Sequence, residues 1–211
     1  MTEFLQKTTE NVFYVELWLR DADAETFKVL NYTYAIDKNS VYTIMGKVKG
    51  ADIETFEVLD DGKYLLWYDR FDTPEYTFYG YAKDKNNVFY HDYDGAPRII
   101  KNADLRTFKS LNDGYYAKDK NHVYGNGKVI KKADVNSWRK ISEIPNAHYS
   151  KDISRIFYAF WEIDVDYETF EVVIPENAKS IEYQLAKDKE KFYRNGEIIN
   201  AEEFEELKNE T

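Results

Sequence analysis

Apolar and polar positions recur in one fixed order along the chain, in six copies that follow one another. Each copy starts with Leu or Tyr. Asp follows three residues later in five of the six copies. An apolar residue stands four residues after that position, and an aromatic residue follows it directly. Further on stands a second aromatic residue, with Asp or Asn four residues before it and an aliphatic residue three after it. Residues that recur in every copy serve the fold first, so the pattern predicts stacked tandem repeats.

The copies span residues 5–30, 34–59, 81–111, 116–141, 149–173 and 185–207 of one predicted domain, residues 1–211. Their first residues are Leu5, Tyr34, Tyr81, Tyr116, Tyr149 and Leu185, and the next column holds Thr8, Asp37, Asp84, Asp119, Asp152 and Asp188. The aromatic column is Phe13, Tyr42, Phe89, Tyr124, Phe157 and Tyr193, and the second aromatic column is Phe27, Phe56, Phe108, Trp138, Phe170 and Phe204. The residues four positions before the second aromatic are Asp23, Asp52, Asp104, Asp134, Asp166 and Asn200.

Each column predicts a local element. The Asp-Lys-Asn motifs at residues 37–39, 84–86 and 119–121 suit the tip of a hairpin, because Asp and Asn bond their own backbone and tolerate left-handed conformations. Asn-Gly at residues 126–127 and 195–196 predicts a second turn, followed by another short strand. The Asp or Asn before the second aromatic is a helix cap, which predicts one helical turn with the aromatic and aliphatic residues on the same side.

The fold class predicted from these elements is mainly β, with two or three short antiparallel strands and a capped helical turn in each copy. Unequal copy lengths favour an open curved array, and a closed propeller-like ring is the alternative, since closure would remove exposed strand edges. At the end of the chain, residues 200–208 predict a helix with glutamates in its first turn, which closes the array with a polar face.

One segment lies outside the repeat pattern. The step from the aliphatic column to the next Tyr is 4 or 5 residues at Leu30–Tyr34 and Leu111–Tyr116, but 22 residues at Leu59–Tyr81. Residues 60–80 therefore predict an extra hairpin with its turn at Thr73-Pro74. Tyr and Trp are enriched at binding hot spots, so the candidate partner-binding residues are aromatic. They are Trp67, Tyr68, Phe71, Tyr76 and Tyr79. The alternative is that the hairpin widens a sheet and buries these side chains.

Composition and charge narrow the functional classes. The chain has 211 residues, 43% hydrophobic and 17% aromatic, which is enough to bury a continuous core, and it contains no cysteine for disulfides or zinc ribbons. The net charge of −10 is uneven: residues 98–140 carry 11 Lys and Arg against 4 Asp and Glu, whereas both flanks are acidic. The acidic flanks could attract a basic partner. Nucleic-acid binding is disfavoured because the chain as a whole would repel phosphate.

Catalytic and metal-binding patterns are weak. The three histidines, His91, His122 and His148, lack the spacing of metal ligands and are expected on the surface. Acidic fragments at residues 21–25, 92–95 and 164–168 lack the Gly and Glu positions of a calcium loop. No phosphate loop, nucleophile elbow or His-Glu-x-x-His motif occurs. We therefore expect a protein that is not an enzyme, with no cofactor, no metal and no catalytic residue.

The motif Tyr-Ala-Lys-Asp-Lys-Asn-x-Val-Phe-Tyr at residues 81–90, with Ala-Asp-x-x-Thr-Phe at 103–108, resembles the bacterial DKNYY repeat family. Residues 34–42 and 116–124 match nearly as well, and the first, fifth and sixth copies are degenerate. The resemblance covers most of the chain. It implies a bacterial source and a β-rich repeat protein, and it transfers no catalytic or binding residue.

These observations favour a non-enzymatic protein-binding repeat module, in its sharpest form an immunity-type protein that neutralises a basic bacterial toxin. The alternative is a cell-envelope or surface repeat protein with a structural or glycan-binding role. The expected partner is another protein, a basic one in the sharper form of the function, with no nucleic acid and no membrane span. Residues 1–10 lack the apolar stretch of a signal peptide, so the cytoplasm is expected, or the bacterial envelope if a leader has been removed. The oligomeric state stays open.

Overall fold

The structure is a computed structural model that describes residues 5–7, 12–14, 17–19, 21–68, 73–92, 95–142, 147–174 and 184–209. The chain divides into two compact units. The first comprises Met1–Tyr64 and Thr77–Lys120, and the second comprises Leu65–Tyr76 and Asn121–Thr211. The single domain expected for residues 1–211 stays a prediction.

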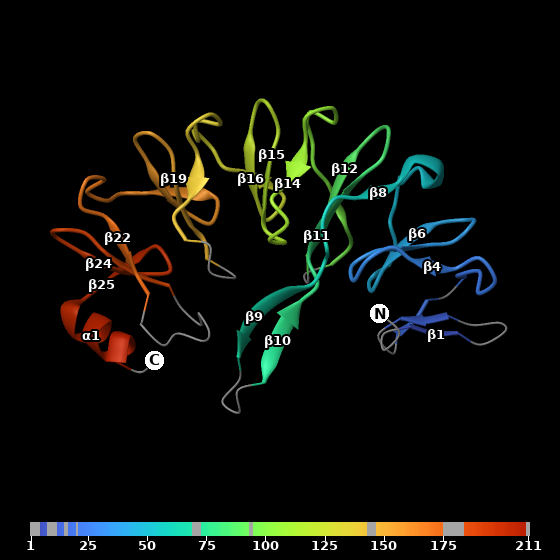
Figure 1. The fold of residues 1–211 in the computed structure, drawn as a ribbon, viewed down its shortest axis with the longest axis horizontal. Coiled ribbons are helices and arrows are strands. Elements are labelled where there is room, and N and C mark those ends of the chain that lie inside the picture. Colours follow the sequence, from blue (N-terminus) through green and yellow to red (C-terminus); the bar gives the residue numbers. More distant parts are fainter. Residues whose placement is uncertain are drawn as a thin grey trace. The chain divides into compact units, whose positions relative to one another are not determined.

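The first unit consists of short antiparallel strands (Figure 1). Its first sheet has the order β1-β2-β3, with β1 (Leu5–Lys7), β2 (Val12–Tyr14) and β3 (Leu17–Trp18). Next comes β4-β5-β6-β7, with β4 (Lys28–Val29), β5 (Ala35–Ile36), β6 (Val41–Thr43) and β7 (Gly46–Lys47). The third sheet is β13-β12-β11-β8, with β8 (Glu57–Val58), β11 (Gly80–Lys83), β12 (Val88–His91) and β13 (Arg98–Ile99). β14 (Lys109–Ser110) then pairs with β15 (Tyr116–Lys118).

The second unit repeats this arrangement. β16 (Val123–Gly125) pairs with β17 (Lys128–Val129). The sheet β18-β19-β20-β21 contains β18 (Arg139–Lys140), β19 (Tyr149–Lys151), β20 (Ile156–Tyr158) and β21 (Trp161–Ile163). The sheet β22-β23-β24-β25 contains β22 (Glu171–Val173), β23 (Leu185–Lys187), β24 (Phe192–Arg194) and β25 (Glu197–Ile199), and the helix α1 (Ala201–Asn209) follows. The predicted mainly β repeat fold is confirmed, and every sheet of the described residues is open, with two edge strands.

The turns form where the sequence predicts them. The Asp84 carboxylate accepts the backbone N–H groups of Asn86 and Asn87, each at 2.7 Å, and this closes the turn between β11 and β12. Asn126 and Gly127 both have positive φ, 50° and 67°, as a two-residue hairpin loop between β16 and β17 requires. At the C-terminal end, the Asn200 side chain accepts the N–H of Glu203 at 2.9 Å and caps the predicted helix.

The helical turn differs from its prediction. The turn is short, a 3-10 turn η1 (Ile53–Thr55) in one copy, and it ends before the second aromatic residue. The following residues form the first strand of a sheet, for example β8 after Phe56. Each sheet of the described copies therefore has up to four strands instead of two or three. Among the residues that the structure describes, only α1 carries the aromatic and aliphatic residues, Phe204 and Leu207, on a helix as expected.

One hydrogen-bonded arrangement, here called the latch, joins five of the capped turns to the next hairpin, whose turn begins with the column Asp. In the first such pair, the Asp37 carboxylate accepts the backbone N–H of Asp23 at 2.7 Å, and Asp23 accepts the Thr26 hydroxyl at 2.7 Å. The same backbone bond recurs four more times, at Asp52–Asp84, Asp104–Asp119, Asp134–Asp152 and Asp166–Asp188, with lengths of 2.7 to 3.0 Å. The capped turn at the end of one sequence copy thus belongs structurally to the hairpin of the next copy.

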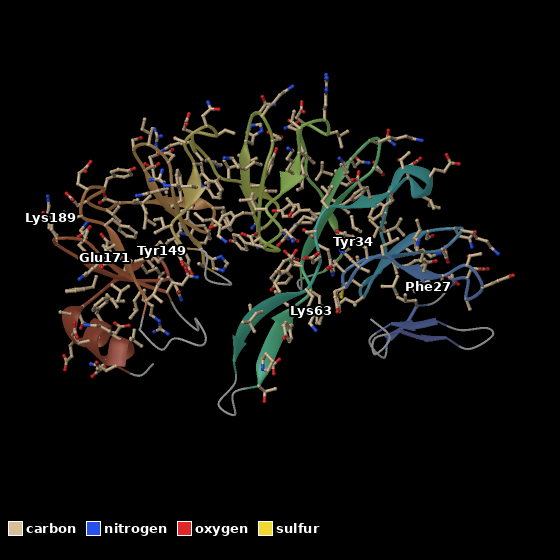
Figure 2. The ribbon with its side chains drawn as sticks, in the orientation of Figure 1. Phe27, Tyr34, Lys63, Tyr149, Glu171 and Lys189 are labelled. Carbon is tan, nitrogen blue, oxygen red and sulfur yellow. The ribbon has the colours of Figure 1, made fainter. Side chains whose placement is uncertain are left out.

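The hydrophobic core lies between consecutive sheets. Within the first unit, Tyr34 and Val41 of one sheet pack in one cluster with Ala82 and Phe89 of the next. The Tyr34 ring lies 5.4 Å from that of Phe56, and its hydroxyl donates to the carbonyl of Gly80 at 3.0 Å (Figure 2). The first-column Tyr residues therefore join neighbouring sheets by packing and by a hydrogen bond.

Tyr149 has the corresponding place in the second unit, with its ring 5.4 Å from Phe170 and its hydroxyl accepting the N–H of Gly196 at 2.9 Å (Figure 2).

The expectation of surface histidines is wrong for His91. This side chain is 1% exposed beneath Tyr34, with ring centroids 6.4 Å apart, and burial lowers its pKa to about 4.

Candidate functional site

The segment outside the repeat forms a separate two-stranded sheet. β9 (Tyr64–Tyr68) and β10 (Pro74–Thr77) pair with each other and with no strand of the repeat sheets among the described residues. Pro74 is the first residue of β10, a place in a strand where its missing N–H is tolerated. The extra hairpin is as the sequence predicts, except that Pro74 belongs to the strand and not to the turn.

The proposed contact residues are distributed along this hairpin. Trp67 and Tyr68 lie on β9, and the positions of their side chains, like the whole of Phe71, are outside the described residues. Tyr76 lies on β10 and is 40% exposed, and Tyr79 follows the strand and is half-buried. Residues 73–76 are all exposed. For the part of β10 that the structure describes, the hairpin does not widen a repeat sheet and does not bury its aromatic residue.

The base of the hairpin, here called the root and comprising residues 60–64 and 77–80, is fixed within the first unit. The Thr33 hydroxyl lies within hydrogen-bond distance of two root carbonyls, those of Gly62 at 3.0 Å and Tyr79 at 3.1 Å. The Asn31 amide donates to the carbonyl of Asp60 at 2.9 Å. Both chain segments of the root are thereby attached to the connection between β4 and β5.

The root also contacts the connection between β14 and β15. The Asn112 side chain accepts the backbone N–H of Asp61 at 2.9 Å and the Tyr64 hydroxyl at 3.1 Å, and it donates to the Asp61 carboxylate at 2.9 Å. Lys63 extends toward Tyr32, with its ammonium nitrogen 5.1 Å from the centroid of that ring (Figure 2). The hairpin therefore begins and ends on residues that are hydrogen-bonded to two connections of the repeat.

An ionisable carboxyl group, that of Asp60, lies inside this root. The Asp60 Oδ2 atom accepts the N–H of Tyr81 at 2.8 Å and the Ser110 hydroxyl at 3.2 Å, while Oδ1 is buried without a hydrogen-bond partner. Burial raises the pKa of the Asp60 carboxyl to about 7, the two hydrogen bonds oppose this, and the nearby Asp61 and Asp113 carboxylates raise it further. The root thus contains a carboxyl group that titrates near neutral pH.

Sequence reasoning places the hairpin but misses the root residues. Asn31, Thr33 and Asn112 stand between the repeat columns, in connections where spacing carries no signal. The available signal is their type, since Asn and Thr side chains bond to backbone groups in turns. Gly62 shows how close these contacts are: its φ is +76°, and a Cβ atom there would lie 2.5 Å from the Thr33 hydroxyl oxygen.

The comparisons with known proteins agree with the repeat. The model described as the DKNYY family matches residues 4–161 and, in a second match, residues 81–210. No curated protein and no solved structure matches the chain. No helix of the described residues is long and apolar enough to cross a membrane.

Proposed function

The chain belongs to the DKNYY family, and from its hairpin we propose that it is a non-enzymatic protein-binding repeat module. The observation that carries the proposal is the exposed strand β10 of a hairpin that stands outside the repeat and is anchored at its root. The recurrent residues have structural roles in the latch and in the core between sheets. Residues that contact a partner are therefore to be sought where the chain departs from its own repeat.

The hairpin meets the physical requirements of a contact surface. Its root residues are hydrogen-bonded to two connections of the first unit and are ordered before a partner binds, which lowers the entropic cost of association. Its sequence is rich in Tyr, Trp and Phe, the types that contribute most binding energy when a partner covers them. The exposed Tyr76 is a residue of this type on the described part of the surface.

The sharper form of the proposal is an immunity-type protein that neutralises a basic toxin in the bacterial cytoplasm. Its support is charge: residues 1–97 and 141–211 carry net charges of −8 and −9, which accelerates encounter with a basic protein and makes binding sensitive to salt. A structural or glycan-binding role at the cell envelope is the competing function, and it requires no basic protein partner.

The test is to capture partners from the native host with a tagged protein at low and high salt. A hairpin variant has residues 65–76 replaced by Asn-Gly, which retains Tyr64 and the root residues 77–80. The point variant is Tyr76→Ser. Its matched control is Ile198→Ser, which removes an apolar side chain that is 62% exposed on β25. Circular dichroism and thermal unfolding verify that all variants are folded.

We expect one stoichiometric basic protein that is captured by the wild type and by Ile198→Ser, is weakened by Tyr76→Ser and is lost with the hairpin variant. Loss of that protein at high salt supports the charge argument. Equal capture by the hairpin variant would refute the hairpin as the contact surface. Recovery of the protein alone at both salt concentrations would refute the binding function and favour the envelope role.

A further inference from the structure

A cleft of about 400 Å³ lies in the second unit and is lined by no residue of the hairpin root. It is bounded by the turn of residues 152–155, by β21 and by the following capped turn, and Lys132 closes one side. Its polar lining is Lys132, Ser154, Arg155, Glu162, Asp164 and Tyr167. This volume is in the range of sites for small molecules.

The six copies of the repeat serve as an internal reference for this lining. Lys132 has a left-handed backbone, with φ of 66°. The equivalent positions of three other copies are also left-handed and hold Asp21, Gly50 and Asn102, the types that adopt this conformation at low cost. A Lys at such a position violates the local rule, and violations without a structural reason mark functional residues.

Two more lining residues depart from their columns. Tyr167 follows the capping Asp, where the other copies have Ala24, Ile53, Leu105, Val135 and Ala201. Glu162 lies opposite the column aromatic Phe157 in the sheet register, where the other paired strands have Trp18, Lys47, Ile99, Val129 and Ile198, none of them acidic. The Tyr167 hydroxyl donates to the carbonyl of Asp152 at 2.8 Å and so has a structural role, which leaves Lys132 and Glu162 as the two departures that carry the argument.

The charges in the cleft surround a carboxylate. The Lys132 ammonium nitrogen lies 2.7 Å from Glu162 Oε2, and the Arg155 Nε atom lies 3.8 Å from Oε1. The Glu162 side chain is 38% exposed, so this carboxylate is held between two cations at the surface and not in the core. A ligand carboxylate that displaced the Glu162 carboxylate would meet the same two cations.

We propose that this cleft binds a small hydroxylated monocarboxylate, such as a sugar acid. The ammonium of Lys132 and the guanidinium of Arg155 hold the ligand carboxylate, and Glu162 turns away to the solvent. The carboxylate of Asp164 and the hydroxyl of Ser154 then bind ligand hydroxyl groups. The carboxylates of Glu162 and Asp164 repel additional negative charge, which favours a monoanion over a phosphate ester. The proposal is independent of the protein-binding function, because it uses neither the hairpin nor its root.

The experiment titrates the full-length protein with D-glucuronate at low ionic strength and measures binding by calorimetry and ligand-observed NMR. D-glucose and glucose 6-phosphate are the comparison ligands, without charge and with two charges. Lys132→Asn introduces the residue type that Asn102 has at the equivalent position, and Lys131→Asn removes the same charge from the neighbouring position, which does not line the cleft. Glu162→Gln removes the internal carboxylate without a change of shape.

We expect glucuronate to bind more tightly than either comparison ligand. Lys132→Asn should weaken binding about tenfold, since a charge-assisted hydrogen bond is lost, and Lys131→Asn should change it by less than about twofold. Glu162→Gln should strengthen binding severalfold, because it removes a competing carboxylate. Failure of glucuronate to bind, equal losses with both lysine variants, or weaker binding by Glu162→Gln would each overturn the proposal. Lys132→Asn should retain its fold, because Asn adopts the left-handed conformation more readily than Lys.

Discussion

The Asp84 carboxylate accepts the backbone N–H of Asp52 at 2.7 Å across 32 residues of sequence, the longest separation in the five latches. The Asp37 carboxylate makes the same bond to Asp23 at the same distance across 14 residues. The additional separation arises from the inserted hairpin, which leaves the latch unchanged. An insertion between two sheets is therefore tolerated when both of its ends stay on the repeat, since a longer loop adds little closure entropy.

Substitution Asp84→Ala should destabilise the protein by at least about 2 kcal/mol, because this 4% exposed carboxylate accepts three backbone N–H groups that would lose their partner. The measurement is the urea midpoint at constant slope. Glu54→Ala on the same turn is the control, since Glu54 is exposed and the change should stay within about 0.5 kcal/mol. Equal effects of the two substitutions would contradict a structural role for the latch.

The hydrogen bond from the Tyr34 hydroxyl to the carbonyl of Gly80, which joins two sheets, predicts a second effect on stability. Tyr34→Phe retains the ring packing on Phe56 but removes the hydroxyl that donates to the carbonyl of Gly80. We expect a loss of about 1–2 kcal/mol in the free energy of unfolding, because the carbonyl is left without this partner in the core. Tyr76→Phe removes a hydroxyl from a ring that is 40% exposed, where water can replace a lost contact, and its cost should be smaller, within about 0.5 kcal/mol. A stability of Tyr34→Phe equal to that of the wild type would show that packing alone joins the sheets.

The columns of the sequence predict the turns, the strands and the insertion, because these depend on local propensities and on recurrence. The sequence could not show whether a capped turn bonds to the hairpin before it or to the hairpin after it, because the spacing is compatible with both. The bond from Asp84 to Asp52, which decides this, is a long-range contact. The burial of His91 was missed for the same reason: it follows from the packing of Tyr34 of another sheet. The left-handed conformation of Lys132 becomes visible only in the backbone, although its column of Asp, Gly and Asn indicates a turn.

Two glycines allow the cost of backbone strain alone to be compared with the cost of strain plus a steric clash. Gly46 lies on β7, and Gly62 lies in the root. Gly46 has φ of +101° and open space around it, whereas Gly62 has φ of +76° and a Cβ there would lie 2.5 Å from Thr33 Oγ1 and 3.0 Å from the Thr33 backbone nitrogen. Gly46→Ala should cost about 1–2 kcal/mol, from the left-handed conformation alone. Gly62→Ala should cost clearly more in the same denaturation experiment. Equal costs would mean that the root relaxes without resistance and is not a rigid base.

The Asp60 carboxyl in the root makes stability depend on pH. Burial raises its pKa to about 7 from the usual 3.8, so the folded state binds the proton more tightly than the unfolded state does. The stabilising contribution of this proton is therefore fully present below about pH 4, and it is lost as the pH rises through 7. The charged groups near Asp60 are Asp61 and Asp113, whose negative charges act in the same direction.

Asp60→Asn should remove this dependence. Its urea midpoint should change less between pH 5 and pH 9 than that of the wild type, whose free energy of unfolding should fall by more than about 1.4 kcal/mol over this range, the equivalent of one pKa unit. The slope with pH is the quantity compared, because the amide also alters hydrogen bonding at the buried Oδ1 position. Glu54→Gln, an exposed carboxyl control, should retain the wild-type slope. An unchanged slope in Asp60→Asn would show that another group titrates, and the root would then be fixed independently of pH.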